Sequence, residues 1–112
     1  MATVDECRAA LHKLAERLAA NAAEAREKFD FDRSLACRIT DLGISFHGQL
    51  KGGQITGLTD GDDPGAKIKL TSSSDDLVAL VNGNLNVMSA WTSGRIKIDA
   101  GMLDLLKLRK LL

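Results

Sequence analysis

The segment from residue 66 to residue 112 restricts the fold most, because short strands and short capped helices follow one another along it. Residues 66–70 (AKIKL) and 95–99 (RIKID) place apolar side chains at alternate positions, which is typical of strands with one buried face. Between them, Ser73 or Ser74 is in position to cap one helix and Asn86 a second. This order of elements indicates an α+β domain.

The chain is predicted to close with a very apolar helix that begins at about residue 100. Its apolar residues fall nearly all round the helix: Met102, Leu103, Leu105, Leu106, Leu108, Leu111 and Leu112. A helix of this composition is expected to be buried on more than one side. One side can be covered by a sheet, and the other then needs a ligand, a second helix or another subunit.

The first half of the chain predicts one long helix followed by a hairpin. Thr3 and Glu6 have the spacing of a capping box, and apolar residues then recur every three or four positions as far as Phe29. Glycines at 52 and 53 predict a tight turn between two strands. The strands predicted in this half cover 34–40, 44–50 and 54–59.

Length and charge limit the function as well as the fold. With 112 residues, we expect one domain that spans 1–112 and has a core of its own. Lys and Arg number 15, as do Asp and Glu, so the basic excess of most nucleic-acid binders is missing. No apolar run reaches the ~18 residues of a membrane span, so we expect no stable membrane insertion. Without a recognisable export signal, a cytoplasmic location is expected.

Residues that could carry chemistry are few and scattered. His12 and His47 fall on polar phases of their segments, and Cys7 and Cys37 fall on apolar phases, which predicts surface histidines and buried free thiols. The aspartates of the turn at 60–65 lack the spacing of a calcium loop. We therefore expect no catalytic residue, no metal, no cofactor and no enzymatic activity.

The second half resembles the sterol carrier protein type 2 family, also called the sterol-binding domain, and in particular its stand-alone bacterial-type members. The resemblance is carried by KIKLTSSSDDLVALVNGNLN, then SAW, then GRIKI, then MLDLLKL, in the family's order and spacing. It implies a mainly antiparallel five-stranded sheet covered by helices, which enclose an apolar cavity. It also implies a ligand among fatty acids, acyl esters, sterols and phospholipids.

Together, these observations favour a protein that holds a hydrophobic small molecule without acting on it. The residues expected to contact that ligand are the apolar ones of the three helices in the second half: Leu77, Leu80, Val81, Met88, Trp91, Met102, Leu103 and Leu106. The alternative is a protein–protein interaction module, in which the same helices bind a partner protein or a second copy and the cavity is vestigial.

Overall fold

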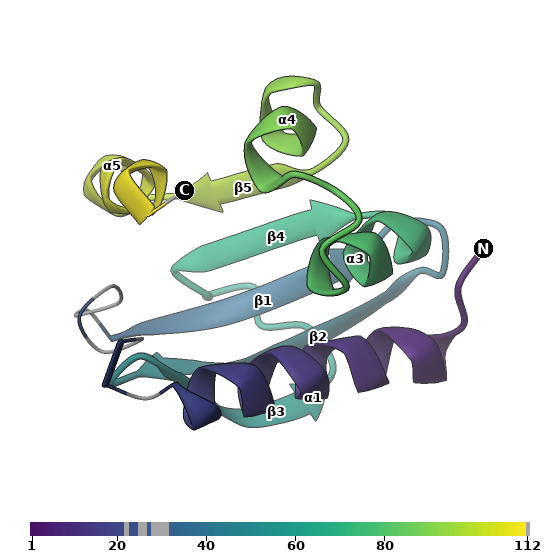
Figure 1. Cartoon of the computed structure of the whole chain (residues 1–112). Helices are drawn as coiled ribbons and strands as arrows, with labels where there is room; N and C mark the ends of the chain where they lie inside the picture. The colour runs from purple at the N-terminus through teal and green to yellow at the C-terminus, as the bar shows by residue number, and fades with distance from the viewer. Residues whose placement is uncertain (22, 25–26, 28–31, 112) are drawn as a thin grey trace.

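The computed structural model describes residues 1–21, 23–24, 27 and 32–111, with side chains up to Leu106. Its centre is one sheet with the strand order β3-β2-β1-β4-β5 (Figure 1). Among these strands, β1 and β4 pair in parallel and the other three pairs are antiparallel. The predicted α+β fold with a mainly antiparallel sheet is confirmed. The strands are β1 Arg33–Ile39, β2 Ile44–Lys51, β3 Gln54–Asp60, β4 Ile68–Ser72 and β5 Lys97–Ala100.

Helices α1 (Val4–Ala20) and α3 (Ser74–Val81) pack on the same face of the sheet, which we call the inner face. Helix α4 (Val87–Thr92) and helix α5 (Met102–Leu111) lie beyond β4, on either side of β5 (Figure 1). The N-terminus and α5 are at opposite ends of the molecule.

The predicted helix caps are present. Thr3 and Glu6 form a reciprocal capping box at the start of α1, because each side chain accepts a hydrogen bond from the other's backbone amide. The side chain of Ser73 caps α3, and that of Asn86 caps α4. Each cap provides an acceptor for a backbone amide that has no partner within its helix.

The first helix is shorter than the apolar repeat predicts. Helix α1 ends at Ala20, with Asn21 as its C-cap. The side chain of Asn21 donates to the carbonyl of Arg17 at 3.0 Å, so it competes for an acceptor at the end of the helix. Phe29, the predicted end of the repeat, lies outside the described residues.

The core fills the space between the two helices and the inner face. Strand residues Cys37, Ile39 and Phe46 pack there against Leu11 of α1 and Leu77 of α3. The alternation that predicted β1 and β2 is confirmed, because Ile39 and Phe46 are each only 1% exposed. Cys7 and Cys37 are free thiols inside this core.

A hydrogen-bonded cluster around Ser74 joins three distant parts of the chain. The amide and hydroxyl of Ser74 donate to the carboxylate of Asp41, at 2.8 and 2.6 Å. The backbone amide of Ala2 donates to the Ser74 hydroxyl at 3.1 Å. The hydrogen bonds from the Ser74 hydroxyl and amide lower the pKa of Asp41. Together with the bond from Ala2, they hold the β1–β2 turn and the N-terminus against the start of α3.

The closing helix is less buried than its composition predicts. The side chains of Met102, Leu103 and Leu106 are 80, 75 and 52% exposed, and the buried residue of its first turn is Asp104. The Asp104 carboxylate accepts a hydrogen bond from Arg33 Nε at 2.9 Å. The expectation of burial on several sides is therefore wrong for the described part of α5, because its buried side chain is the ion-paired Asp104, whereas three of its apolar side chains are exposed.

The buried thiols give a first testable prediction. Burial raises the pKa of Cys37 to about 12 and also raises the pKa of Cys7, so neither thiol should react with an alkylating reagent in the native protein at pH 8. Both should react after denaturation, as counted by mass spectrometry. Rapid native labelling of either cysteine would contradict the described core.

The raised pKa of the Cys37 thiol should also make the free energy of unfolding depend on pH in the alkaline range. Its ordinary pKa is 9.0, so between about pH 9 and pH 12 the unfolded chain loses this proton while the folded protein keeps it. The free energy of unfolding should therefore fall as the pH rises through this range, and it should fall less steeply in Cys37→Ala. Urea titrations at several pH values measure the two slopes. Equal slopes would contradict the raised pKa.

Candidate functional site

An apolar pocket of about 130 Å³ lies between α1 and the inner face of the sheet. It is formed by α1 and by strands β1 to β4. His47 and Gly48 line it together with ten apolar residues: Leu11, Leu14, Leu35, Ala36, Cys37, Phe46, Ile55, Leu58, Ile68 and Leu70. A pocket with this lining suits a hydrocarbon group better than a polar molecule.

A bulge between β2 and β3 shapes one wall of this pocket. The register of the two strands shifts between His47 and Gln49, so Gly57 and Leu58 lie together opposite Gly48. Gly57 has a φ of +63°, which glycine adopts without strain. The extra residue returns Leu58 to the inner face, where strict alternation along β3 would turn it outward.

The absence of a side chain at Gly48 allows β3 to lie close to β2 at the bulge. A Cβ atom at Gly48 would lie 3.1 Å from the carbonyl oxygen of Thr56 and 3.4 Å from Cα of Leu58. A side chain here would push β3 away from β2. The close approach of these two strands therefore depends on a glycine at this position.

An apolar row continues from the pocket towards β5. Strand register places Leu35 opposite Ile68, and Ile68 opposite Ala100, on the inner face. Leu50 and Ile98 pack into the same cluster. We call these five residues the inner-face row. Because the row crosses β2, β1, β4 and β5, it links the pocket beneath α1 to the region of α4 and α5.

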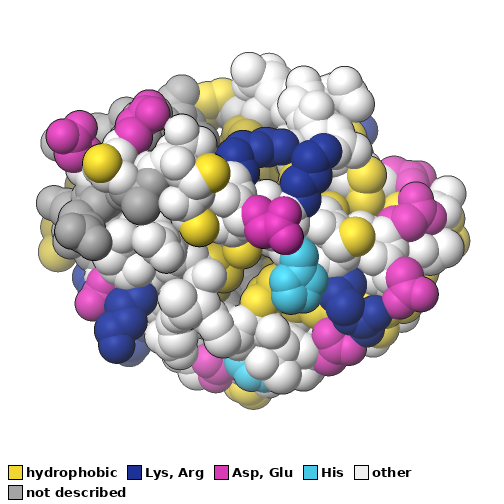
Figure 2. Space-filling model, turned by 60° about the horizontal axis from the view of Figure 1, so that its bottom comes forward, with side chains coloured by type: hydrophobic (Ala, Val, Ile, Leu, Met, Phe, Trp, Pro, Cys, Tyr) yellow, Lys and Arg dark blue, Asp and Glu magenta, His cyan; other side chains and the backbone are white. Residues whose placement is uncertain are grey.

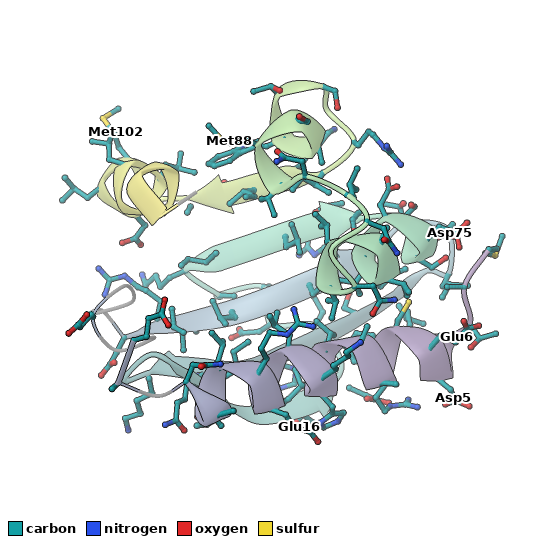
Figure 3. All side chains as sticks on the ribbon, in the orientation of Figure 1. Asp5, Glu6, Glu16, Asp75, Met88 and Met102 are labelled. Carbon is teal, nitrogen blue, oxygen red and sulfur yellow. The ribbon has the colours of Figure 1, made fainter. Side chains whose placement is uncertain are left out.

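A second hollow, of about 260 Å³, lies between α4 and α5 and is lined by Met88, Trp91, Thr92 and Leu105. Met88 extends from α4 towards α5 (Figure 3). The indole of Trp91, the sole tryptophan, is half-buried here. Intrinsic tryptophan fluorescence therefore reports on this hollow.

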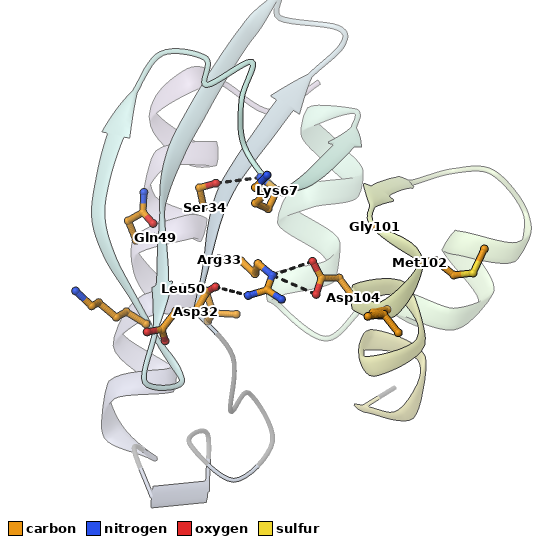
Figure 4. Close-up of a pocket in the computed structure, with 11 residues that line it drawn as sticks. Asp32, Arg33, Ser34, Gln49, Leu50, Lys67, Gly101, Met102 and Asp104 are labelled. Atoms are coloured by element: carbon orange, nitrogen blue, oxygen red, sulfur yellow. Dashed lines mark hydrogen bonds and ion pairs between the residues drawn. The ribbon is translucent and has the colours of Figure 1, made fainter.

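An open polar groove of about 830 Å³ borders the start of α5. Arg33 crosses it to Asp104, with Nε at 2.9 and 3.2 Å from the two carboxylate oxygens (Figure 4). Lys51 and Lys67 also line the groove. Among the described residues, the Arg33–Asp104 ion pair connects α5 to strand β1 of the sheet.

Several other charged side chains form paired contacts on the surface. Arg8 Nη2 donates a hydrogen bond to Asp60 at 2.5 Å, and this bond lowers the pKa of Asp60. The Arg8 guanidinium also lies 5.9 Å from the ring centre of Phe46, within the range of a cation–π contact. Arg38 pairs with Asp62 at 3.0 Å. Figure 2 shows basic and acidic side chains side by side on one face, with hydrophobic side chains between them. Within the described residues, no cluster of His, Cys, Asp or Glu could hold a metal ion.

The structure separates the residues predicted to contact a ligand. Leu77 and Val81 are buried in the core against α1, and Leu80 is half-buried on the same helix. Met88 and Trp91 lie together in the hollow beside α5. Met102 and Leu103 border the polar groove, and both are largely exposed, as is Leu106.

The pocket beneath α1 was not among the predicted contacts. Its strand residues, such as Leu35 and Ile68, were recognised only as the buried phase of the sheet. Gly57 within the apolar alternation of β3 was a usable signal, because a glycine inside a strand often marks a bulge. The position of a bulge decides which side chains meet a pocket, and this one brings Leu58 inward.

The fold is α+β, with a five-stranded sheet whose inner face is covered by α1 and α3. The chain belongs to the SCP-2 sterol transfer family, whose model matches residues 10–112. No curated protein sequence matches it.

Several solved structures share the fold. A crystal structure of sterol carrier protein 2 has a TM-score of 0.64 at 19% identity and covers 97% of this chain and 92% of its own. Sterol carrier protein 2 from Aedes aegypti, solved with the C16 fatty acid palmitate, has a TM-score of 0.54 at 24% identity, covering 80% and 84%. The inverting sec-alkylsulfatase Pisa1 from Pseudomonas sp. has a TM-score of 0.60 at 22% identity over 81% of this chain. The chain spans 14% of that sulfatase's length.

The attachment of α5 can be tested by removing Arg33. The Asp104 side chain is 9% exposed, so Arg33→Ala leaves a nearly buried carboxylate without this partner. We expect the free energy of unfolding to fall by about 1–3 kcal/mol, measured by urea titration. The matched control is Arg38→Ala, which removes an exposed pair and should cost under about 1 kcal/mol. Equal losses would show that Arg33–Asp104 is an ordinary surface pair.

Proposed function

We propose that this protein reversibly binds a long-chain lipid on the inner face of its sheet and carries out no reaction on it. One observation carries the proposal: the apolar pocket beneath α1 continues into the inner-face row, which crosses four strands. Membership of a sterol transfer family supports a lipid ligand, as does the palmitate held by a structural relative.

The volume of the pocket sets how binding must proceed. About 130 Å³ equals the space of roughly four water molecules in the liquid. A lipid chain of ordinary length needs more, so α1 and the sheet must separate as the chain enters. Each buried methylene contributes about 0.8 kcal/mol, and the cost of this separation and of ordering the ligand offsets part of the gain. We expect dissociation constants of about micromolar.

The predicted contact residues divide into three roles in this proposal. Met88 and Trp91 contact the distal part of the ligand in the hollow beside α5. Leu77, Leu80 and Val81 form the wall that α3 presents when α1 moves. Met102, Leu103 and Leu106 meet the ligand only at the mouth of the site, since they are exposed.

Selectivity for the head group should be weak. Among the described residues, no charged side chain lines the pocket beneath α1, so the pocket offers no counter-charge for a carboxylate or phosphate. Binding then depends mainly on apolar area. Fatty acids, acyl esters, sterols and phospholipids are therefore all candidate ligands.

Filling the pocket should abolish binding. Leu58→Trp puts a larger side chain on the inner face, whereas Thr56→Trp adds the same group to an exposed position of the same strand. Calorimetric titration with palmitate should give about micromolar affinity for the natural protein and for Thr56→Trp. We expect at least about tenfold weaker binding for Leu58→Trp.

Thermal unfolding of both variants shows whether they are folded. Equal affinities in the two variants would place the ligand elsewhere. Absence of binding by the natural protein to palmitate, a sterol and a phospholipid would contradict the proposed function.

The small volume of the pocket favours a second candidate, an interaction module whose cavity is vestigial. Native mass spectrometry of the purified protein separates the two, because it reports bound lipid and subunit number together. A monomer with co-purified lipid supports the carrier. An empty dimer supports the interaction module.

A further inference from the structure

Helix α1 is attached to α3 through a partly buried contact. Leu11 of α1 and Val81 of α3 belong to the same core cluster. Arg17 Nη1 donates to the carbonyl of Val81, and Lys13 Nζ donates to the side chain of Asn82, each at 3.0 Å. Val81 and Asn82 stand at the end of α3, where backbone carbonyls have no partner within the helix. Core packing and hydrogen bonds therefore join these two helices.

The other side of α1 meets strand β3 through a more exposed contact. Arg8 Nε and Nη2 donate to the two carboxylate oxygens of Asp60, at 3.1 and 2.5 Å. Among the described residues, these are the hydrogen bonds that join α1 to β3. The side chains of Arg8 and Asp60 are 36 and 61% exposed, so water competes for their charges. We call the boundary between α1 and β3 the seam, and this ion pair the seam pair.

Two hollows border Phe46, whose ring lies beneath the Arg8 guanidinium. The pocket of about 130 Å³ separates Leu14 of α1 from Leu58 of β3. The second hollow, of about 250 Å³, is lined by Val4, Ile44, Ser45, Phe46, Asp60 and Gly61. Side chains that face a void have few contacts to lose, so opening the seam costs little packing energy. Figure 2, which brings this side of the molecule forward, shows hydrophobic side chains between charged ones.

Strand β3 is also weakly held on its own side of the seam. It stands at the edge of the described sheet and pairs with β2 alone. The bulge between His47 and Gln49 interrupts this pairing, because a bulge leaves one residue outside the ladder. The α1–β3 contact is therefore easier to open than the α1–α3 contact.

We propose that the ligand enters by opening of the seam. The seam pair breaks, α1 tilts away from β3 while it stays attached to α3, and the two hollows join into one cavity. The inference rests on the proposed function, which requires α1 to separate from the sheet but leaves open along which edge. Helix α1, like the other helices in the described part of the chain, lacks the length and apolarity to cross a membrane.

Removing the seam pair should tighten ligand binding. If the pair is broken in the bound state, its loss lowers the cost of opening and raises the population that can bind. We expect Asp60→Ala to bind palmitate about two- to fivefold more tightly than the natural protein, by calorimetric titration. The matched control is Asp62→Ala, which removes the exposed pair with Arg38 and should leave the affinity unchanged.

Arg8→Gln separates opening from direct contact with the ligand. It should tighten binding as Asp60→Ala does, because either change removes the same pair. Weaker binding by Arg8→Gln would show that Arg8 contacts the ligand. Unchanged affinity in both variants would show that the pair stays closed. Either result would overturn the inference.

Cross-linking tests which edge of α1 moves. Arg8→Cys with Asp60→Cys, joined by a short bis-maleimide, closes the seam and should weaken palmitate binding at least about tenfold. Lys13→Cys with Asn82→Cys, joined in the same way, ties α1 to α3 and should bind like the natural protein. The native thiols are buried and should not interfere. Equal losses in the two proteins, or no loss in the first, would overturn the inference.

A measurement without ligand separates this inference from the proposed function. The side chain at position 58 is half-buried behind the seam, so alkylation of Leu58→Cys in the native protein reports its opening. Adding Asp60→Ala should speed this alkylation about two- to fivefold, whereas adding Asp62→Ala should not. Equal rates would overturn the opening of the seam even if palmitate binds. Absence of lipid binding together with a faster rate would contradict the proposed function and leave the opening itself supported.

Discussion

Burial of one face of the sheet is the constraint on which the rest of the structure depends. Helices α1 and α3 cover the inner face, and the main core lies between them and strands β1 and β2. The same alternation that buries Ile39 and Phe46 also places Leu35, Ile68 and Ile98 on that face, further along and across the sheet. The apolar row is thus a continuation of the core. A domain built in this way can offer an apolar surface to a ligand without any residue set aside for chemistry.

Two local features convert this general plan into a site. The glycines at 48 and 57 allow β3 to approach β2 closely and bring Leu58 inward, which gives the pocket its wall. The Arg33–Asp104 pair decides how α5 is rotated, so that Leu105 faces Trp91 while Leu103 and Leu106 face solvent. Both features use few atoms. Their influence is large because each one decides which apolar side chains are covered.

The sequence predicted element order well and side-chain environment less well. Alternating residues such as Leu35, Cys37 and Ile39 identified their strand, and capping residues such as Thr3 and Asn86 identified helix starts, because these signals are local. The burial of α5 was wrongly predicted from its composition. An ion pair between Arg33 and Asp104 spans the chain from β1 to α5, and no local pattern reveals it. The pocket was missed for a similar reason, since it depends on the register of a bulge between two strands.

The location of the ligand is the central claim, and methyl NMR spectroscopy tests it directly. Isoleucine methyl groups are well distributed, with Ile55, Ile68 and Ile98 along the pocket and inner-face row, and Ile96 outside them. Titration with palmitate should shift the methyl signals of the first three, with intermolecular nuclear Overhauser effects to the acyl chain, and leave that of Ile96 nearly unchanged. Contacts confined to the exposed side chains of α5, with no change at Ile55 or Ile68, would contradict a ligand on the inner face of the sheet.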